Sequence, residues 1–267
     1  MTLRERGLRA ARRAARDYLK RWGVRHPEDI RVEAMADAEG MRIVEGPLRG
    51  ARGRLSLGLT PIIRIAENTI EEGARRFTIA HEIGHRVLRH PYNDAGGACA
   101  SARAAASLDS NWRDYEAEAN AFASELLMPR HLVAPCCVGD PSLEIPRAIA
   151  LEFTTSIPAS AIRYIQMTSS RCAAVYSQKG RIEWAPKSRG FKVSLQRGQS
   201  LPRESFAYAC ASSQDHDDRA RKLDAGIWFD TPKQKIDIVE HSAPVSEAGG
   251  VITLLWVPEV AASTLWA

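Results

Sequence analysis

The chain has 267 residues, of which 45% are hydrophobic, and it carries a formal net charge of +5. This length exceeds that of most single domains, so we expect two domains that each bury a core. No apolar run approaches a membrane span, the basic N-terminal segment does not resemble a secretory signal, and the five cysteines show no C-x-x-C spacing, so we expect a cytoplasmic protein rather than a membrane or disulfide-rich secreted one.

The N-terminal segment, residues 2–22, has the spacing of an amphipathic helix that ends at Gly23. Nine basic and only two acidic residues fall within the first 25 residues. Such a face can bind the phosphates of a nucleic acid, but it is also typical of a helix whose charged side faces solvent, and we favour the second interpretation. We expect the inward side to consist of Leu3, Leu8, Ala11, Ala15, Leu19 and Trp22.

A short helix over 27–38 and three strands at 41–44, 54–59 and 62–66 are predicted next. The second strand alternates polar and apolar residues, as a half-buried strand does. We expect Arg54–Leu59 to lie at a sheet edge beside the site described below, where an extended peptide can add as a further strand.

The stretch RFTIAHEIGHRVLRH, residues 76–90, contains an H-E-x-x-H motif at His81, Glu82 and His85. On a helix, the two histidines lie one turn apart on the same face, so both imidazoles can bind one metal ion. Glu82 lies next to them, where it can take a proton from an attacking water. Apolar residues at three- and four-residue spacing predict this helix, and Gly84 lets a partner helix approach.

The stretch YEAEANAFASELLMP, residues 115–129, supplies candidates for a third ligand on a second predicted helix. A zinc hydrolase uses three protein ligands and keeps one position open. Glu116 and Asn120 are four residues apart, so Glu116 can bind the metal while Asn120 hydrogen-bonds a ligand imidazole. Glu118 is the competing third ligand, and we favour Glu116 because of its Asn120 partner. The donor set favours Zn²⁺, although other divalent ions accept it too.

Between the two motifs, residues 91–109 are rich in Ala, Gly and Ser and predict a loop near the metal. His90 and Tyr92 at its start are candidates for stabilising an oxyanion, but we favour surface positions for both. The expected helix caps are Asn68 or Thr69 for the first motif helix and Asp109 or Ser110 for the second.

The C-terminal half begins with a predicted helical pair over 142–167. Its pattern is similar to a helix-turn-helix, with Arg163, Tyr164 and Gln166 as the polar side chains of the second helix, although we favour packing against the preceding domain over DNA binding. From Arg171 onward, short β-rich runs alternate with Gly, Pro and Asp. We predict strands at 172–176, 182–184, 191–195, 205–211, 226–229 and 251–257, a surface loop or helix at 214–222, and exposed positions for His216 and His241.

The two motifs together resemble the ImmA/IrrE family of zinc metallopeptidases, over roughly residues 5–135. The resemblance implies an α+β chain in which residues 1–135 form a zincin-like metallopeptidase domain with a small sheet and an active-site helix. A helical, helix-turn-helix-like segment over 136–169 and a β-rich domain over 170–267 are expected to follow.

The family resemblance also carries expectations for the site and the substrate. It implies a zinc endopeptidase of the gluzincin type, with His81, His85 and Glu116 as Zn²⁺ ligands and Glu82 as the catalytic residue. The implied partner is a protein substrate, namely a helix-turn-helix repressor of a stress-response or mobile-element circuit.

Two hypotheses compete with the peptidase. In the first, the chain is a DNA-binding transcriptional regulator that uses residues 142–167 and the basic N-terminal helix, with a structural or sensory metal. In the second, it is a toxin-like or immunity partner that acts by binding alone. An open metal site argues against the second hypothesis, because binding alone does not require one.

Overall fold

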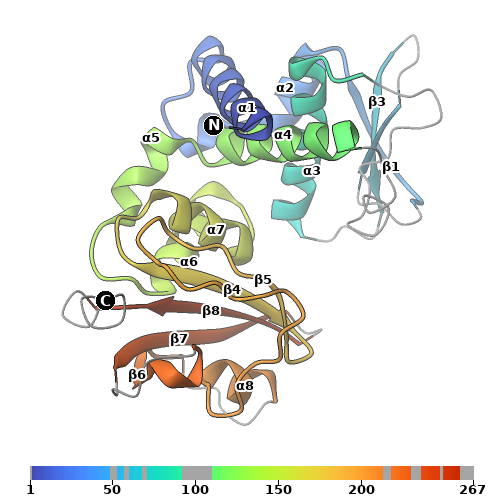
Figure 1. Cartoon of the computed structure of the whole chain (residues 1–267). Coiled ribbons are helices and arrows are strands. Elements are labelled where there is room, and N and C mark those ends of the chain that lie inside the picture. Colours follow the sequence, from blue (N-terminus) through green and yellow to red (C-terminus); the bar gives the residue numbers. More distant parts are fainter. Residues whose placement is uncertain are drawn as a thin grey trace. The chain divides into compact units, whose positions relative to one another are not determined.

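A computed structural model describes residues 2–48, 53–56, 60–67, 71–91, 110–212, 218–229, 236–246 and 249–258. Contacts divide the chain into two units (Figure 1): Met1–Val133 with Glu152–Thr155, and Ala134–Leu151 with Ser156–Ala267. Both units combine helices with a sheet, which confirms the α+β class. The predicted three-part division at 135 and 169 stays a prediction. No helix among the described residues has the length and apolar character needed to cross a membrane.

The described residues of the first unit form a three-stranded sheet and five α-helices. The strands are β1 (Arg42–Gly46), β2 (Gly53–Ser56) and β3 (Ile62–Ala66), in the order β1-β3-β2, with β1 parallel and β2 antiparallel to β3. The helices are α1 (Leu3–Arg21), α2 (Val32–Ala38), α3 (Glu72–Leu88), α4 (Ser110–Leu127) and α5 (Arg130–Val133), with a 3₁₀ turn η1 (Pro27–Asp29) before α2. The predicted edge position is confirmed for β2, while residues 57–59 of that predicted strand lie outside the described ones.

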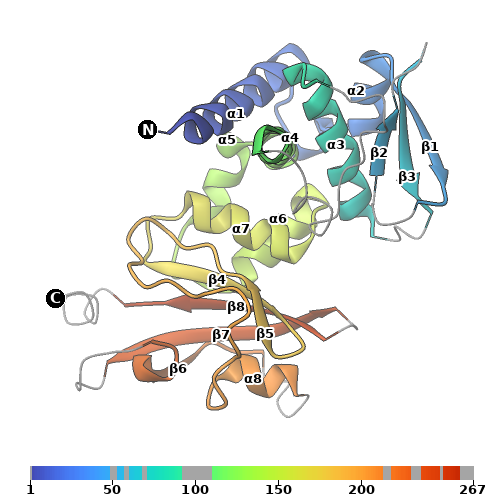
Figure 2. The ribbon, with the colours of Figure 1, turned by 45° about the vertical axis from the view of Figure 1, so that its right-hand side comes forward.

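The basic helix α1 packs along α4 (Figures 1 and 2). It begins with a capping box, in which the Thr2 and Glu5 side chains accept each other's backbone N–H groups, and Gly23 with φ of 65° follows its end. Its inward side buries Ala11, Ala15, Tyr18 and Leu19. The prediction of Leu3 as an inward residue is wrong, because the first turn lies outside the packed surface and Leu3 is 84% exposed.

The second unit is built on a five-stranded, fully antiparallel sheet of order β5-β4-β8-β7-β6. The strands are β4 (Cys172–Gln178), β5 (Arg181–Trp184), β6 (Arg221–Asp224), β7 (Asp237–Ser246) and β8 (Gly250–Trp256). The helices are α6 (Glu144–Phe153), α7 (Ile157–Met167) and α8 (Phe206–Ala211), and the 3₁₀ turns are η3 (Ala134–Cys137) and η4 (Ala225–Ile227). One core joins side chains from β4, β5, β7 and β8 to Phe191, Ala207 and Trp228.

Three predicted strands of the second unit are wrong. Most of the segment 205–211 forms α8, because Ser205 caps this helix and the buried carboxylate of Glu240 accepts the N–H of Ala207 at its first turn. Residues 226–229 contain the end of the 3₁₀ turn η4 and the two residues after it, and 191–195 form no strand although Phe191 is buried. The strands β6 and β7 were not predicted.

Two polar predictions for this unit also change. The expected exposure of His241 is wrong: it is buried, its Nε2 lies 3.0 Å from Asp218 Oδ1, and its Nδ1 accepts the N–H of Leu143 at 3.2 Å. His216 lies outside the described residues. Helix α7 contacts β4, and Arg163 and Tyr164 are buried, so these two side chains are not available to read DNA bases.

Candidate metal centre

The two histidines of the H-E-x-x-H motif lie on the buried face of α3. Every residue from Thr78 to His85 is buried, because this part of the helix packs on α4 and on the sheet. The Nε2 atoms of His81 and His85 face each other at 2.9 Å, and the ring centroids lie 4.7 Å apart. The one-turn spacing thus brings both imidazoles to one point, as predicted.

Glu116 of α4 completes this cluster. Its Oε2 lies 3.4 Å from His81 Nε2 and its Oε1 lies 3.3 Å from His85 Nε2. One ligand atom from each of the three residues lies within 4.8 Å of the others. Atoms that bind a tetrahedral zinc at about 2.1 Å lie about 3.3 Å apart, so the carboxylate–imidazole distances fit such an ion. Of the two candidate glutamates, Glu116 is the one that the structure brings to the paired imidazoles.

The His81 ring has a hydrogen-bond partner on the nitrogen that does not face the cluster. Nδ1 of His81 lies 2.9 Å from Oδ1 of Asn120, one turn after Glu116 on α4. Because an amide oxygen can only accept, the ring must carry its proton on Nδ1, which leaves the lone pair of Nε2 for a metal. The predicted role of Asn120 therefore has a geometric basis.

Glu82 is buried beside the cluster, and its Oε1 has no hydrogen-bond partner among the described residues. A buried carboxylate without a partner is costly, so such groups usually have a chemical role. Burial raises the pKa of Glu82 to about 7, although the neighbouring His81 opposes the rise. The carboxyl group is therefore able to exchange a proton near neutral pH.

The remaining titratable groups also respond to burial. Burial lowers the pKa of His85 to about 4, so its imidazole is neutral at physiological pH. For Glu116, burial alone would raise the pKa, but the facing imidazoles of His81 and His85 outweigh it and lower this pKa to about 2. A neutral imidazole at His85 and an ionised carboxylate at Glu116 are the forms in which these side chains bind metals.

His90 belongs to the centre, and the prediction of a surface position for it is wrong. Its ring is buried, its Nδ1 lies 2.9 Å from His85 Nδ1, and its Nε2 lies 3.1 Å from Glu118 Oε2. The chain reaches this position because Arg89 ends α3 in the left-handed conformation, with φ of 56°, and the N–H of His90 then bonds back to the carbonyl of His85 at 3.1 Å. Tyr92, the other oxyanion candidate, lies outside the described residues.

The close approach of α3 and α4 depends on Gly84. A Cβ atom at this position would lie 3.1 Å from the Phe122 ring and 3.3 Å from the carbonyl oxygen of Ala119. Both distances are tighter than ordinary van der Waals contact, so glycine allows the helices to bring their side chains to one point, as predicted.

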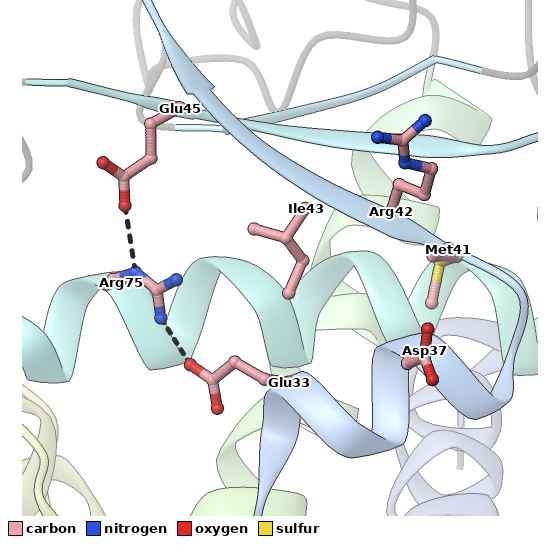
Figure 3. A pocket seen from close by; sticks show the side chains of 7 residues that line it. All are labelled: Glu33, Asp37, Met41, Arg42, Ile43, Glu45 and Arg75. Atoms are coloured by element: carbon pink, nitrogen blue, oxygen red, sulfur yellow. Dashed lines mark hydrogen bonds and ion pairs between the residues drawn. The ribbon is translucent and has the colours of Figure 1, made fainter.

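A hollow of this unit lies beside α3, between α2 and β1 (Figure 3). Figure 3 shows Arg75 of α3 between Glu33 of α2 and Glu45 of β1, and it forms ion pairs with both. Asp37, Met41, Arg42 and Ile43 complete the lining. These ion pairs tie the first turn of α3 to the sheet and to α2, and they contain none of the residues of the metal cluster.

The helix-borne set of two imidazoles and one carboxylate is the donor set of a metallopeptidase. Residues 36–138 match the model of the peptidase M78 family, described as the IrrE N-terminal-like domain. The resemblance stated from the two motifs is thereby confirmed, and this part of the chain is similar to an IrrE N-terminal-like domain.

Comparison with other proteins adds a likeness in fold. Eight chains of solved structures match, among them a Mycobacterium tuberculosis transcriptional regulator with a TM-score of 0.61 and 14% identity, over 93% of this chain and 76% of that one. At this identity the likeness concerns the fold alone. No curated protein matches.

Proposed function

We propose that the protein is a zinc-dependent endopeptidase in which His81, His85 and Glu116 hold the ion. The observation that carries this proposal is the convergence of two Nε2 atoms and a carboxylate oxygen beside the buried carboxyl of Glu82. Membership of residues 36–138 in a peptidase family supports it.

The chemistry divides between the ion and the chain. When bound, the zinc ion acts as a Lewis acid that polarises the scissile carbonyl and makes water a better nucleophile. Glu82 accepts the proton of the water that adds to the carbonyl carbon, and it delivers that proton to the amide nitrogen as the C–N bond breaks. Its Oε1 is suited to this task, because no donor in the part of the chain that the structure describes competes for its lone pairs.

The substrate is proposed to be a helix-turn-helix repressor that presents an extended segment to the edge strand β2. This partner follows from the family resemblance, and the sheet order supports the mode of binding, because β2 lies at one edge. Gly53 of β2 lies against α3, where a Cβ atom would be 2.1 Å from Thr78 Cγ2. The edge strand is therefore held next to the helix that carries the motif.

The test uses the purified chain, a helix-turn-helix repressor encoded beside its gene, and zinc. We expect Glu82→Gln to retain stoichiometric zinc by elemental analysis and to lose cleavage by about 10²- to 10⁴-fold. We expect His85→Ala to lose zinc as well as cleavage. A Glu82→Gln variant that cuts at the wild-type rate removes Glu82 as the base, and unchanged zinc in His85→Ala removes that ligand.

A second candidate function is DNA-binding transcriptional regulation. Two observations favour it: the fold likeness to a protein called a transcriptional regulator, and the many exposed basic side chains of α1. DNA affinity that falls steeply with salt, without cleavage of the repressor, would support this function. The burial of Arg163 and Tyr164 weighs against α7 as its recognition helix.

A further inference from the structure

We propose that His90 and Glu118 are positioning residues that orient His85 for metal binding. This inference rests on the proposed function, because it takes His85 Nε2 as a ligand atom. It assigns a role to two residues outside the H-E-x-x-H motif and outside the three-ligand set.

The first support is the position of the proton on each imidazole ring in the series of hydrogen bonds from His85 through His90 to Glu118. If Nε2 of His85 offers its lone pair to a metal, the ring proton must lie on Nδ1 and be donated to Nδ1 of His90, 2.9 Å away. His90 then carries its own proton on Nε2, which lies 3.1 Å from the Glu118 carboxylate. A carboxylate only accepts, so with both rings neutral this is the arrangement that satisfies both contacts.

The second support is the way in which the fold holds the His90 ring. The ring lies edge-on to His85, with centroids 5.0 Å apart and planes at 77°, and it lies beside Tyr115 at 4.8 Å and 33°. The left-handed Arg89 places it there, in a backbone conformation that is sterically unfavourable for a non-glycine residue. Such strain is typical of positions where the backbone serves a site.

The third support comes from α1, far away in sequence. A Cβ atom at Gly7 would lie 2.0 Å from Oε1 of Glu118, so the carboxylate occupies the space that glycine leaves. The N-terminal helix α1 therefore packs directly against the Glu118 side chain. Steric confinement of this kind keeps the carboxylate directed at His90.

The two histidines of the motif thus differ in their support. His81 donates directly to the neutral amide of Asn120, whereas His85 reaches a charged carboxylate through an intervening imidazole. Removal of a hydrogen-bond partner behind a ligand histidine typically lowers metal affinity about 10- to 100-fold. The chain through His90 is expected to fall in this range.

The experiment measures zinc affinity of the full chain by competition with a chromophoric chelator, and the visible spectrum of the cobalt-substituted protein. We expect His90→Phe to weaken zinc binding about 10- to 100-fold and to change the cobalt spectrum. His90→Asn keeps an acceptor near the Nδ1 position and should restore most of the affinity. His131→Phe, at an exposed histidine of α5, is the matched control and should leave both measurements unchanged.

Three further variants, at Glu118 and Gly7, test the end of this series of contacts that lies farthest from His85. Glu118→Gln keeps an acceptor and should weaken zinc binding less than Glu118→Ala does. Gly7→Ala touches no ligand, yet it should weaken zinc binding about tenfold or less by displacing the Glu118 carboxylate, while helix α1 gains in propensity. Nitrogen-15 NMR of the zinc-loaded protein should show protons on Nδ1 of His85 and Nε2 of His90.

The outcomes separate this inference from the proposed function. A wild-type chain that binds zinc and cleaves, with unchanged affinity and spectrum in His90→Phe, overturns the positioning role alone. A proton on Nδ1 of His90 also overturns it. A wild-type chain that does not bind zinc overturns both proposals together.

Discussion

A comparison of two buried glutamates from different units, Glu82 and Glu240, shows how hydrogen-bond partners determine the role of a carboxylate. Glu82 on α3 and Glu240 on β7 are 2% and 0% exposed. Both carboxyl oxygens of Glu240 are used: Oε1 accepts from the Ala207 N–H and the Ser242 hydroxyl, and Oε2 accepts from the Trp228 indole. Glu82 keeps one oxygen without a partner among the described residues. Although the two side chains are almost equally buried, Glu240 has hydrogen-bond partners on both oxygens, whereas one oxygen of Glu82 has none among the described residues.

The difference lies in what the surrounding elements donate. The first turn of α8 directs an N–H at Glu240, so a helix end and a strand are joined through one carboxylate. Next to Glu82 lie His81, which lowers its pKa, and Glu116, which raises it. Hydrogen bonds to both oxygens of Glu240 oppose the rise in pKa that burial causes, whereas Glu82 keeps an oxygen that can accept a proton in the proposed function.

The comparison is tested most strongly by Glu240→Gln. The amide replaces one acceptor oxygen with an N–H₂ group. This donor must then face another donor, either the Trp228 indole N–H or the donors at the first turn of α8. We expect a loss of about 1–3 kcal/mol in the free energy of unfolding, with zinc affinity unchanged. Urea denaturation followed by circular dichroism measures it. A gain in stability would show that the three hydrogen bonds do not offset the burial of this charge.

The same substitution at Glu82 should have the opposite sign in the metal-free protein. Because the pKa of Glu82 rises from 4.5 to about 7 on folding, its ionised form is disfavoured in the folded state. The wild type therefore loses stability as pH rises from the unfolded pKa through the folded one, and Glu82→Gln does not. We expect the variant to be more stable by about 3 kcal/mol above pH 7, with the difference vanishing toward about pH 4. A difference independent of pH would contradict this assignment.

Gly84→Ala tests whether zinc affinity depends on the close approach of α3 and α4 as well as on the ligand residues. Its Cβ would press on Phe122 and Ala119, so we expect a loss of about 1 kcal/mol in stability and weaker zinc binding. Ala80→Gly, one turn earlier on the same buried helix, is a control for changes in helix propensity and is expected to destabilise without a comparable effect on metal. Equal zinc affinities of the two variants would contradict a role for close approach.

The smallest effect is expected at Asp218, whose carboxylate lies beside Arg147 and His241 in the second unit. Burial alone would raise its pKa, but hydrogen bonds from Arg147 and His241 outweigh it and lower the pKa below 3.8. Its contribution is therefore complete above pH 3.8 and is lost as pH falls through the folded value. We expect Asp218→Asn to lose about 0.5 kcal/mol at pH 6, and less at lower pH, in thermal unfolding scans. If the stability difference between the wild type and Asp218→Asn grew as pH fell, the lowered pKa of Asp218 would be contradicted.

The sequence predicts the metal cluster better than its surroundings. Helical spacing alone places His81 and His85 together, and the pair Glu116 and Asn120 follows from the same geometry. His90 escapes this logic because it lies beyond the end of α3, where a left-handed Arg89 turns the chain back. A non-glycine residue in that conformation leaves no clear signal in a single sequence.

In the second unit, local sequence patterns give wrong secondary-structure predictions where contacts between distant residues determine the structure. The alternation in FAYACA resembles a strand, but capping by Ser205 and the carboxylate of Glu240 stabilise a short helix. Strand β7 contains the buried polar residues Glu240, His241 and Ser242, whose partners are distant in sequence, so hydrophobic periodicity does not reveal it. By contrast, the apolar strand β8 was predicted almost in full.

The packing of α1 on α4 has a practical consequence for anyone who works with a shortened chain. A fragment cut at the borders of the family match, 36–138, would omit α1 and with it the Tyr18 ring that meets Phe122 at 6.0 Å. The face of α4 that packs on α1 would then lie open to water, and the Glu118 side chain would lose its steric stop at Gly7. On the positioning role proposed for Glu118, we expect such a fragment to keep His81, His85 and Glu116 and yet to bind zinc more weakly than the full chain.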